Sequence, residues 1–116
     1  MAQKQEKAEL MQGTLDMLIL RTLRAGAKHG YAIARHIQET SDGLLQVEEG
    51  SLYPALHRME RRGWIKAEWG LSETKRKAKY YRLTDTGRAQ LKAKTKTWRS
   101  LVGAIAGVLG TRPAEA

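Results

Sequence analysis

The sequence predicts an α+β, mostly helical chain in which three short helices precede a β-hairpin and one long helix follows it. Three observations support this prediction. Apolar residues recur at helical spacing in three segments before residue 63, alternate with polar residues between 64 and 83, and return to helical spacing over 85–109. The chain has 116 residues, which is enough for one domain with a modest hydrophobic core.

The first two helices are predicted from apolar spacing and from the glycines that follow them. A first helix is expected over residues 9–25, before Gly26, and the polar residues 1–8 are expected to form a flexible arm. After a short connector, a second helix is expected over residues 31–41. The linker 44–49 can contain a short extended segment.

The segment from Gly50 to Gly63 has the start and stop signals of a third helix. Ser51 can act as its N-cap, which places Pro54 in the first turn, where a missing N–H costs little. Gly63 suits the position after the last turn, where the backbone becomes left-handed. An apolar stripe is formed by Leu52, Leu56 and Met59. The other side of the helix presents Ser51, Tyr53, Pro54, His57, Arg58 and Arg61.

Charge is distributed unevenly along the chain. The formal net charge is +9, yet residues 1–49 hold six Lys/Arg against seven Asp/Glu, whereas residues 50–116 hold fifteen against five. Taken alone, a basic helix face is more often simply solvated. A concentration of positive charge in and after the third helix favours a polyanion such as nucleic acid, because phosphate contacts release counterions.

A β-hairpin is predicted directly after the third helix. Residues 64–69 and 79–83 alternate between apolar and polar side chains, and Trp64 and Trp69 are expected in the core of the hairpin. The basic turn between the strands contains Lys75, Arg76 and Lys77, with Lys79 just after it. A hairpin in this position is the wing of a winged helix-turn-helix, and its basic turn is expected to contact phosphates. The alternative is an exposed loop that protects an edge strand.

The last helix is predicted over residues 85–109, with Thr84 as its cap and Asp85 at the positive end of its dipole. Its apolar residues follow a heptad-like spacing, and its second half has no apolar segment left in the chain to pack against. An unpartnered apolar stripe favours a second protomer. The expected dimer residues are Leu91, Trp98, Leu101, Val102 and Ile105. Residues 110–116 are expected to form a flexible tail.

Several function classes are disfavoured by the composition. The chain contains no cysteine, its three histidines lack metal-ligand spacing, and Gly50-Ser51 lacks the context of a nucleophile elbow, so neither an enzyme nor a metal or other cofactor is expected. The polar N-terminus does not resemble a signal peptide, and the longest apolar run is too short to span a membrane. We therefore expect no membrane partner, and we expect a cytoplasmic location.

Five stretches of the chain resemble the PadR family of bacterial transcription regulators, in its short subgroup with a single C-terminal helix. They are residues 13–20, 29–34, 50–60, 63–65 and 79–87, and Trp98 matches as a single residue. Together they cover roughly residues 10–100. One departure is Ala27, where the family usually has a proline.

The resemblance implies a homodimeric winged helix-turn-helix repressor with residues 9–84 as its DNA-binding domain and residues 85–109 as its dimerisation helix. Two third helices would occupy successive major grooves of double-stranded operator DNA, with half-sites about 34 Å apart. The matching groove and phosphate contacts are Ser51, Tyr53, Pro54, His57 and Arg58, with Arg61 beside them, and the matching wing contacts are Lys75, Arg76, Lys77 and Lys79.

The resemblance also implies a role for Trp98, since matching tryptophans in some family members stack on flat hydrophobic or aromatic effectors in the dimer interface. The alternative is that Trp98 is only a packed residue of the dimer interface. For the whole chain, the alternative function is a winged-helix module that contacts proteins without binding operator DNA. The basic third helix argues against that alternative.

Overall fold

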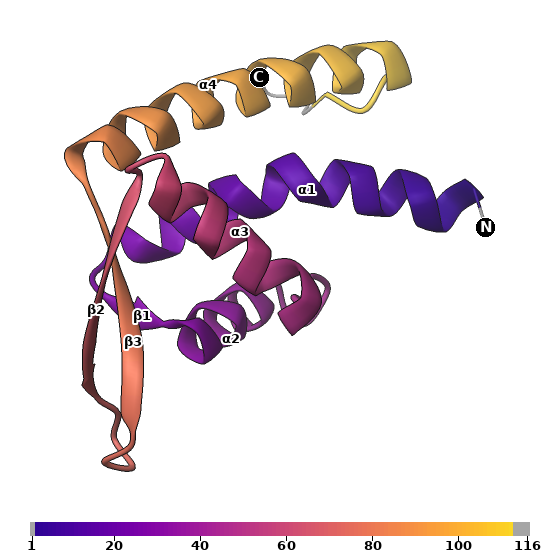
Figure 1. Cartoon of the computed structure of the whole chain (residues 1–116). Coiled ribbons are helices and arrows are strands. Elements are labelled where there is room, and N and C mark those ends of the chain that lie inside the picture. Colours follow the sequence, from indigo (N-terminus) through magenta and orange to yellow (C-terminus); the bar gives the residue numbers. More distant parts are fainter. Residues whose placement is uncertain (1, 113–116) are drawn as a thin grey trace.

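The computed structural model of the protein describes the backbone of residues 2–112 and the side chains of residues 13–112. The element order is α1 (Ala2–Leu23), β1 (Lys28–His29), α2 (Gly30–Thr40), α3 (Glu49–Arg61), β2 (Ile65–Leu71), β3 (Lys77–Leu83) and α4 (Asp85–Leu109). The predicted α+β, mostly helical class is confirmed, with three helices, a hairpin and a long last helix (Figure 1).

The three N-terminal helices and the base of the hairpin enclose one hydrophobic core. Ile19 and Leu20 of α1, Ile33 of α2, and Leu56 and Met59 of α3 are all fully buried. Burying side chains of this size stabilises the fold by about 1.5–3 kcal/mol each before conformational entropy is subtracted. This core holds α3 against the body of the domain by one face only.

The sheet has three antiparallel strands in the order β1-β3-β2. β2 and β3 pair from Ile65↔Leu83 at the base to Leu71↔Lys77 near the tip. The strands are longer than predicted, and the turn is correspondingly shorter, with Lys75 in a left-handed conformation (φ 61°). The hairpin therefore extends well beyond the helices (Figure 1).

Strand β1 was not predicted. The segment expected as a connector instead pairs with β3, Lys28 opposite Tyr81 and His29 opposite Tyr80. The imidazole Nδ1 of His29 also accepts a hydrogen bond from the N–H of Ala32 at 3.2 Å and so caps α2. A two-residue strand has no measurable periodicity, so only its partner strand, about fifty residues later, defines it.

The predicted start of the first helix and the predicted extended segment in the linker before α3 are both wrong. Helix α1 begins at Ala2 rather than near residue 9, so residues 2–8, expected as a flexible arm, are helical. Their Ala, Gln, Lys and Glu residues are strong helix formers, and polarity alone does not break a helix. The linker before α3 contains no strand; Leu45 and Val47 in it are partly buried against the core.

Helix α3 begins two residues before the predicted cap. The carbonyl of Glu48 accepts from the N–H groups of Ser51 and Leu52, so Glu48 is the N-cap and Ser51 lies inside the first turn. Pro54 is then the sixth helical residue, where its missing N–H leaves the carbonyl of Gly50 without its usual intrahelical donor. The prediction that Pro54 lies in the first turn of the helix is therefore wrong. The predicted left-handed Gly63 after the helix is confirmed (φ 77°).

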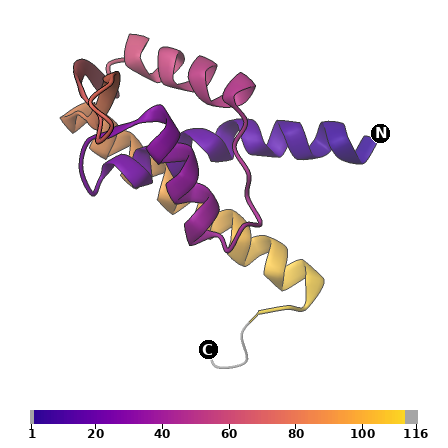
Figure 2. The same cartoon turned by 90° about the horizontal axis from the view of Figure 1, so that it is seen from below.

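Helix α4 has the predicted bounds, and its second half projects from the domain. Its first turns contact α1 and β3, whereas its C-terminal half extends past the three-helix body (Figure 2). The helix ends at Gly110 in the left-handed conformation (φ 72°). The guanidinium Nε of Arg112 then donates to the carbonyl of Gly103 at 3.4 Å, and the remainder of the predicted tail, residues 113–116, lies outside the described residues.

Candidate nucleic-acid interface

Helix α3 has one buried and one exposed face, as its sequence predicted. Leu52, Ala55, Leu56 and Met59 are at most 2% exposed, because they face the core. The opposite side is solvent-accessible along the whole helix. The predicted groove residues on it are Ser51, Tyr53, Pro54, His57 and Arg61, all exposed.

Tyr53 is held in place by a close approach to α2. A Cβ atom on Gly30 would lie 2.9 Å from the phenol oxygen of Tyr53, so a side chain at position 30 would displace the ring. Tyr53 nevertheless remains 39% exposed.

A second tyrosine, Tyr81 of β3, is buried. Loss of solvent contact raises the pKa of Tyr81, and the negative charge of Glu60 is a smaller cause of the same shift.

Arg58 differs from the other predicted contacts because it already has a carboxylate partner. Its guanidinium lies 2.5 Å from the carboxylate of Asp16 on α1, and the two side chains are only 26% and 8% exposed. Buried carboxylates are retained in proteins when a cation and hydrogen bonds compensate their lost hydration. Arg58 thus ties α3 to α1 at the edge of the exposed face. Sequence reasoning did not identify Asp16, because 42 residues separate the pair.

The cations of the hairpin occupy two environments. Lys75 and Arg76 at the tip are exposed, as is Lys77, whose ammonium lies 5.7 Å from the ring centre of Trp69. Lys79 is closer to the body, and its ammonium lies 3.5 Å from the carboxylate of Glu60 on α3. The tip therefore holds its charge in solvent, whereas Lys79 links the hairpin to α3.

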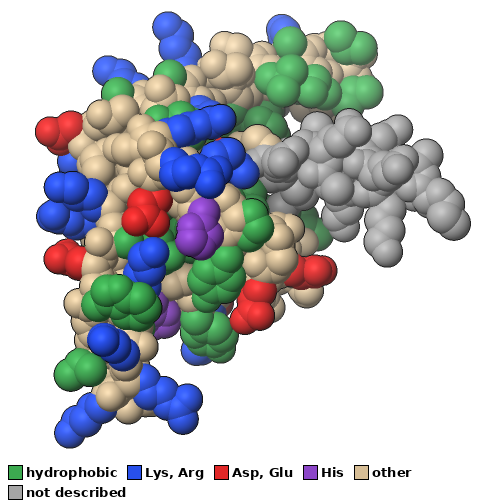
Figure 3. Space-filling model, viewed as in Figure 1, with side chains coloured by type: hydrophobic (Ala, Val, Ile, Leu, Met, Phe, Trp, Pro, Cys, Tyr) green, Lys and Arg blue, Asp and Glu red, His purple; other side chains and the backbone are tan. Residues whose placement is uncertain are grey.

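The exposed side of α3 and the hairpin belong to the same face of the molecule. In the view that places α3 at the front, lysine and arginine side chains lie over α3 and at the tip of the hairpin (Figure 3). The Lys79–Glu60 contact joins the two elements on this face. An elongated anionic partner lying across the face would meet both.

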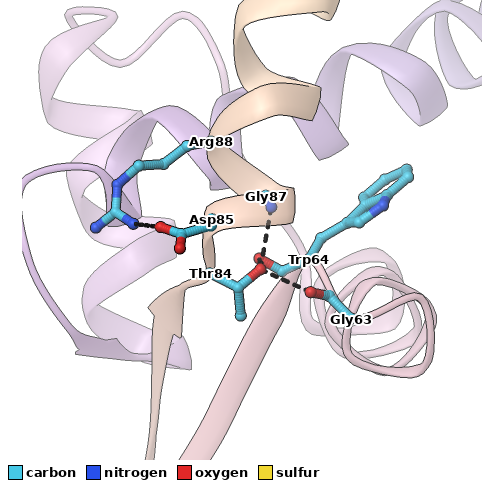
Figure 4. A network of polar contacts seen from close by, with 6 residues as sticks. All are labelled: Gly63, Trp64, Thr84, Asp85, Gly87 and Arg88. Carbon is cyan, nitrogen blue, oxygen red and sulfur yellow. Dashed lines mark hydrogen bonds and ion pairs between the residues drawn. The ribbon is translucent and has the colours of Figure 1, made fainter.

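Helix α4 is anchored on the segment that ends α3 (Figure 4). The Thr84 hydroxyl lies 2.6 Å and 2.9 Å from the carbonyl oxygens of Gly63 and Trp64, to which it can donate its proton, and it accepts from the N–H of Gly87. This confirms Thr84 as the cap of α4. A Cβ on Gly87 would overlap the carbonyl oxygen of Trp64, so only glycine permits this close approach.

The rest of α4 leaves an apolar stripe in solvent. Leu91 is buried in the core of its own chain, which corrects its assignment to the dimer interface. Beyond it, the predicted interface residues Trp98, Leu101, Val102 and Ile105 are 42–48% exposed, and Val108 and Leu109 are more exposed still. These six residues form the α4 stripe.

Two other features, a metal site and a membrane-spanning helix, are absent from the described part of the chain. Among the side chains of residues 13–112, no group of three or more His, Asp or Glu is arranged to hold a metal ion. No helix within residues 2–112 is long and apolar enough to cross a membrane.

Comparison with known proteins identifies the family. The model of the PadR-like transcriptional regulator family matches residues 19–93. An uncharacterised protein from Lysinibacillus sphaericus is 33% identical over 92 residues, 79% of this chain and 84% of that protein. The negative transcriptional regulator PadR of Bacillus subtilis is 31% identical over 77 residues, 66% of this chain but 42% of the longer regulator.

Solved structures of transcriptional regulators share this fold over most of the chain. A transcriptional regulator from Clostridium thermocellum superposes with a TM-score of 0.78 at 34% identity, covering 85% of this chain and 96% of that one. A PadR family transcriptional regulator from Eggerthella lenta gives 0.76 at 32% identity, with 94% and 93% covered. These relatives are regulators of transcription and not enzymes. The extent of these matches shows that the chain belongs to the PadR-like family of transcriptional regulators.

Proposed function

We propose that the protein binds double-stranded operator DNA as a homodimer and represses transcription. The observation that carries the proposal is the single face on which the exposed side of α3 and the basic hairpin tip lie together (Figure 3). A helix that exposes one side along its length fits a major groove, and cations on a projecting hairpin reach the flanking phosphates.

Different parts of the face have different proposed roles. Ser51, Tyr53 and His57 are proposed to contact base edges or nearby phosphates, with Pro54 packed beside them and Arg61 on phosphates. The hairpin contacts are Lys75, Arg76, Lys77 and Lys79. Because Arg58 is paired with Asp16, its main proposed role is to hold α3 in position at the edge of the groove.

The homodimer is proposed from the α4 stripe. The stripe lies on a helix half that projects from its own domain, so a second copy can cover it without disturbing the core (Figure 2). Two-fold symmetry then presents two α3 helices to successive major grooves, about 34 Å apart. A small hydrophobic or aromatic effector that stacks on Trp98 would release the repressor by changing this arrangement. Cytoplasmic location, on the nucleoid when bound, follows from the proposed function.

The proposal is tested by binding to duplex DNA at several salt concentrations. The probes are the DNA upstream of the protein's own gene and a duplex selected by the protein from a random pool. Wild-type protein should bind one duplex preferentially, and Lys77→Ala should reduce the slope of log affinity against log salt by about one. Lys66→Ala is the matched control, because Lys66 is exposed on the opposite face of the hairpin. Absence of any preferred duplex would favour a protein-binding module instead.

A further inference from the structure

Two large apolar side chains lie in solvent at the outer end of β2. Trp69 and Leu71 are 64% and 70% exposed, so the prediction that Trp69 belongs to the core of the hairpin is wrong. The base of the same strand behaves as predicted, since Ile65 is buried and Ala67 partly buried. The strand simply continues beyond the helices that cover its base, and its alternation leaves the last two apolar residues uncovered (Figure 1).

Strand alternation and register place these two residues on the face of the hairpin that is directed toward α3. Side chains of a strand alternate between faces, so Trp69 and Leu71 share the face of the buried Ile65. Their cross-strand neighbours on that face are Lys79 and Lys77. Because Lys79 reaches Glu60 of α3, this face adjoins the exposed side of α3. Hydrophobic side chains with basic ones beside them are visible over the hairpin in the same view as α3 (Figure 3).

The chemistry of this surface matches the groove of a duplex. Deoxyribose presents apolar C–H groups between anionic phosphates, and the hairpin presents an indole opposite Lys79 and a leucine side chain opposite Lys77. Lys77 lies over the Trp69 ring at 5.7 Å, which keeps a cation beside the apolar surface. A second copy of the chain does not offer the same match, because its hairpin carries the same positive charge.

We propose that Trp69 and Leu71 pack against the sugars and base edges of the groove beside the one occupied by α3, while Lys77 and Lys79 contact its phosphates. The hairpin thereby adds an apolar contact that discriminates between sequences by the width and deformability of that groove. This inference rests on the proposed binding of operator DNA. It assigns to the hairpin an apolar contact with DNA in addition to the contacts of its cations with phosphates.

The test uses the full chain and the duplex that wild-type protein selects from a random pool. Trp69→Ala should weaken binding by about tenfold, a typical loss for an aromatic contact residue, and Leu71→Ala should weaken it less. Neither change should alter the salt slope, because neither removes a phosphate contact. Lys77→Ala should flatten the slope by about one. Saturating duplex should also quench a component of tryptophan fluorescence in wild-type protein that Trp69→Phe lacks.

Leu44→Ala is the matched control, since Leu44 is also a highly exposed leucine (82%) but lies in the linker before α3. Thermal melting shows whether each variant is folded, and substitutions at such exposed positions should shift the midpoint little. Unchanged affinity of Trp69→Ala, together with fluorescence that is insensitive to saturating duplex, would overturn the inference while leaving operator binding intact. If the wild-type protein itself selects no duplex, both proposals fail. Binding of an acidic protein through Trp69 in that case would assign the surface to a protein partner.

Discussion

Replacing Gly87 with alanine should change how α4 meets the part of the domain that is proposed to contact DNA. The alanine Cβ would overlap the carbonyl oxygen of Trp64 and press on the side chain of Leu83. The carbonyl cannot move independently, since it accepts hydrogen bonds from the backbone N–H and the hydroxyl of Thr84. The first turn of α4 must therefore shift by roughly 1 Å or more to restore a normal contact distance.

A shift of this size is amplified along the helix. Leu91 is buried in the core and acts as the pivot, about 6 Å along the axis from Gly87 at 1.5 Å per residue. A 1 Å displacement over that arm tilts α4 by about 10°, which moves Ile105, about 21 Å beyond the pivot, by about 3.5 Å. That displacement is close to the rise of one base pair, about 3.4 Å. In the proposed dimer, the two α3 helices would no longer match the half-sites of the wild-type operator.

Duplexes whose half-sites are separated by different numbers of base pairs provide the assay. Gly87→Ala should remain dimeric by sedimentation, melt at a lower temperature because overpacking costs about 1–3 kcal/mol, and bind best at a spacing changed by about one base pair. Arg88→Ala is the control, because it removes an exposed ion pair with Asp85 from the same turn and adds no atoms. If Gly87→Ala is unfolded, Thr84→Val tests the same joint by removing the hydroxyl. A folded variant with the wild-type spacing preference would refute the reasoning.

Three further perturbations have defined outcomes. Asp16→Asn should lower the free energy of unfolding by about 2 kcal/mol in urea titrations, because it leaves Arg58 partly buried without its carboxylate; an unchanged midpoint would show that the pair contributes nothing. Trp98→Ala should raise the dimer dissociation constant in sedimentation, and a dimer of undiminished stability would exclude Trp98 from the interface. The pKa of Tyr81 is raised in the folded state, so stability should fall as the pH rises above about 10; Tyr81→Phe should lessen that fall in alkaline melting curves.

Local signals predicted the parts of the fold that local interactions determine. Thr84 caps α4 through a hydrogen bond to Gly87, three residues away, and Gly63 takes the left-handed conformation that ends α3. Both features depend only on residues close in the sequence. The apolar stripe of α3 is buried because the helical spacing of its apolar residues gathers them on one face, and burial of that face is favourable. The start of α3 was missed because Glu48, which uses no side-chain hydrogen bond as a cap, carries no cap signal in its sequence.

The candidate site was harder to predict, since its charges and surfaces depend on distant partners. Nothing near Arg58 in the sequence indicates that Asp16 holds it. Nothing near Trp69 indicates that the helices stop short of it, because a strand has the same alternation whether its outer end is covered or exposed. Strand β1 was missed for the same reason, as its pairing partner lies in β3.

The distribution of ion pairs distinguishes two parts of the proposed DNA-binding face, the exposed side of α3 and the tip of the hairpin. Of the predicted contact residues, Arg58 and Lys79 each face a carboxylate, so part of their charge is balanced within the fold. Among the described residues, Arg61 and the three cations of the hairpin tip form no ion pair within 4 Å. The other predicted contact residues on the exposed side of α3 are Ser51, Tyr53, Pro54 and His57. The hairpin should therefore supply most of the salt-dependent affinity, and α3 should supply contacts whose strength depends on the base sequence.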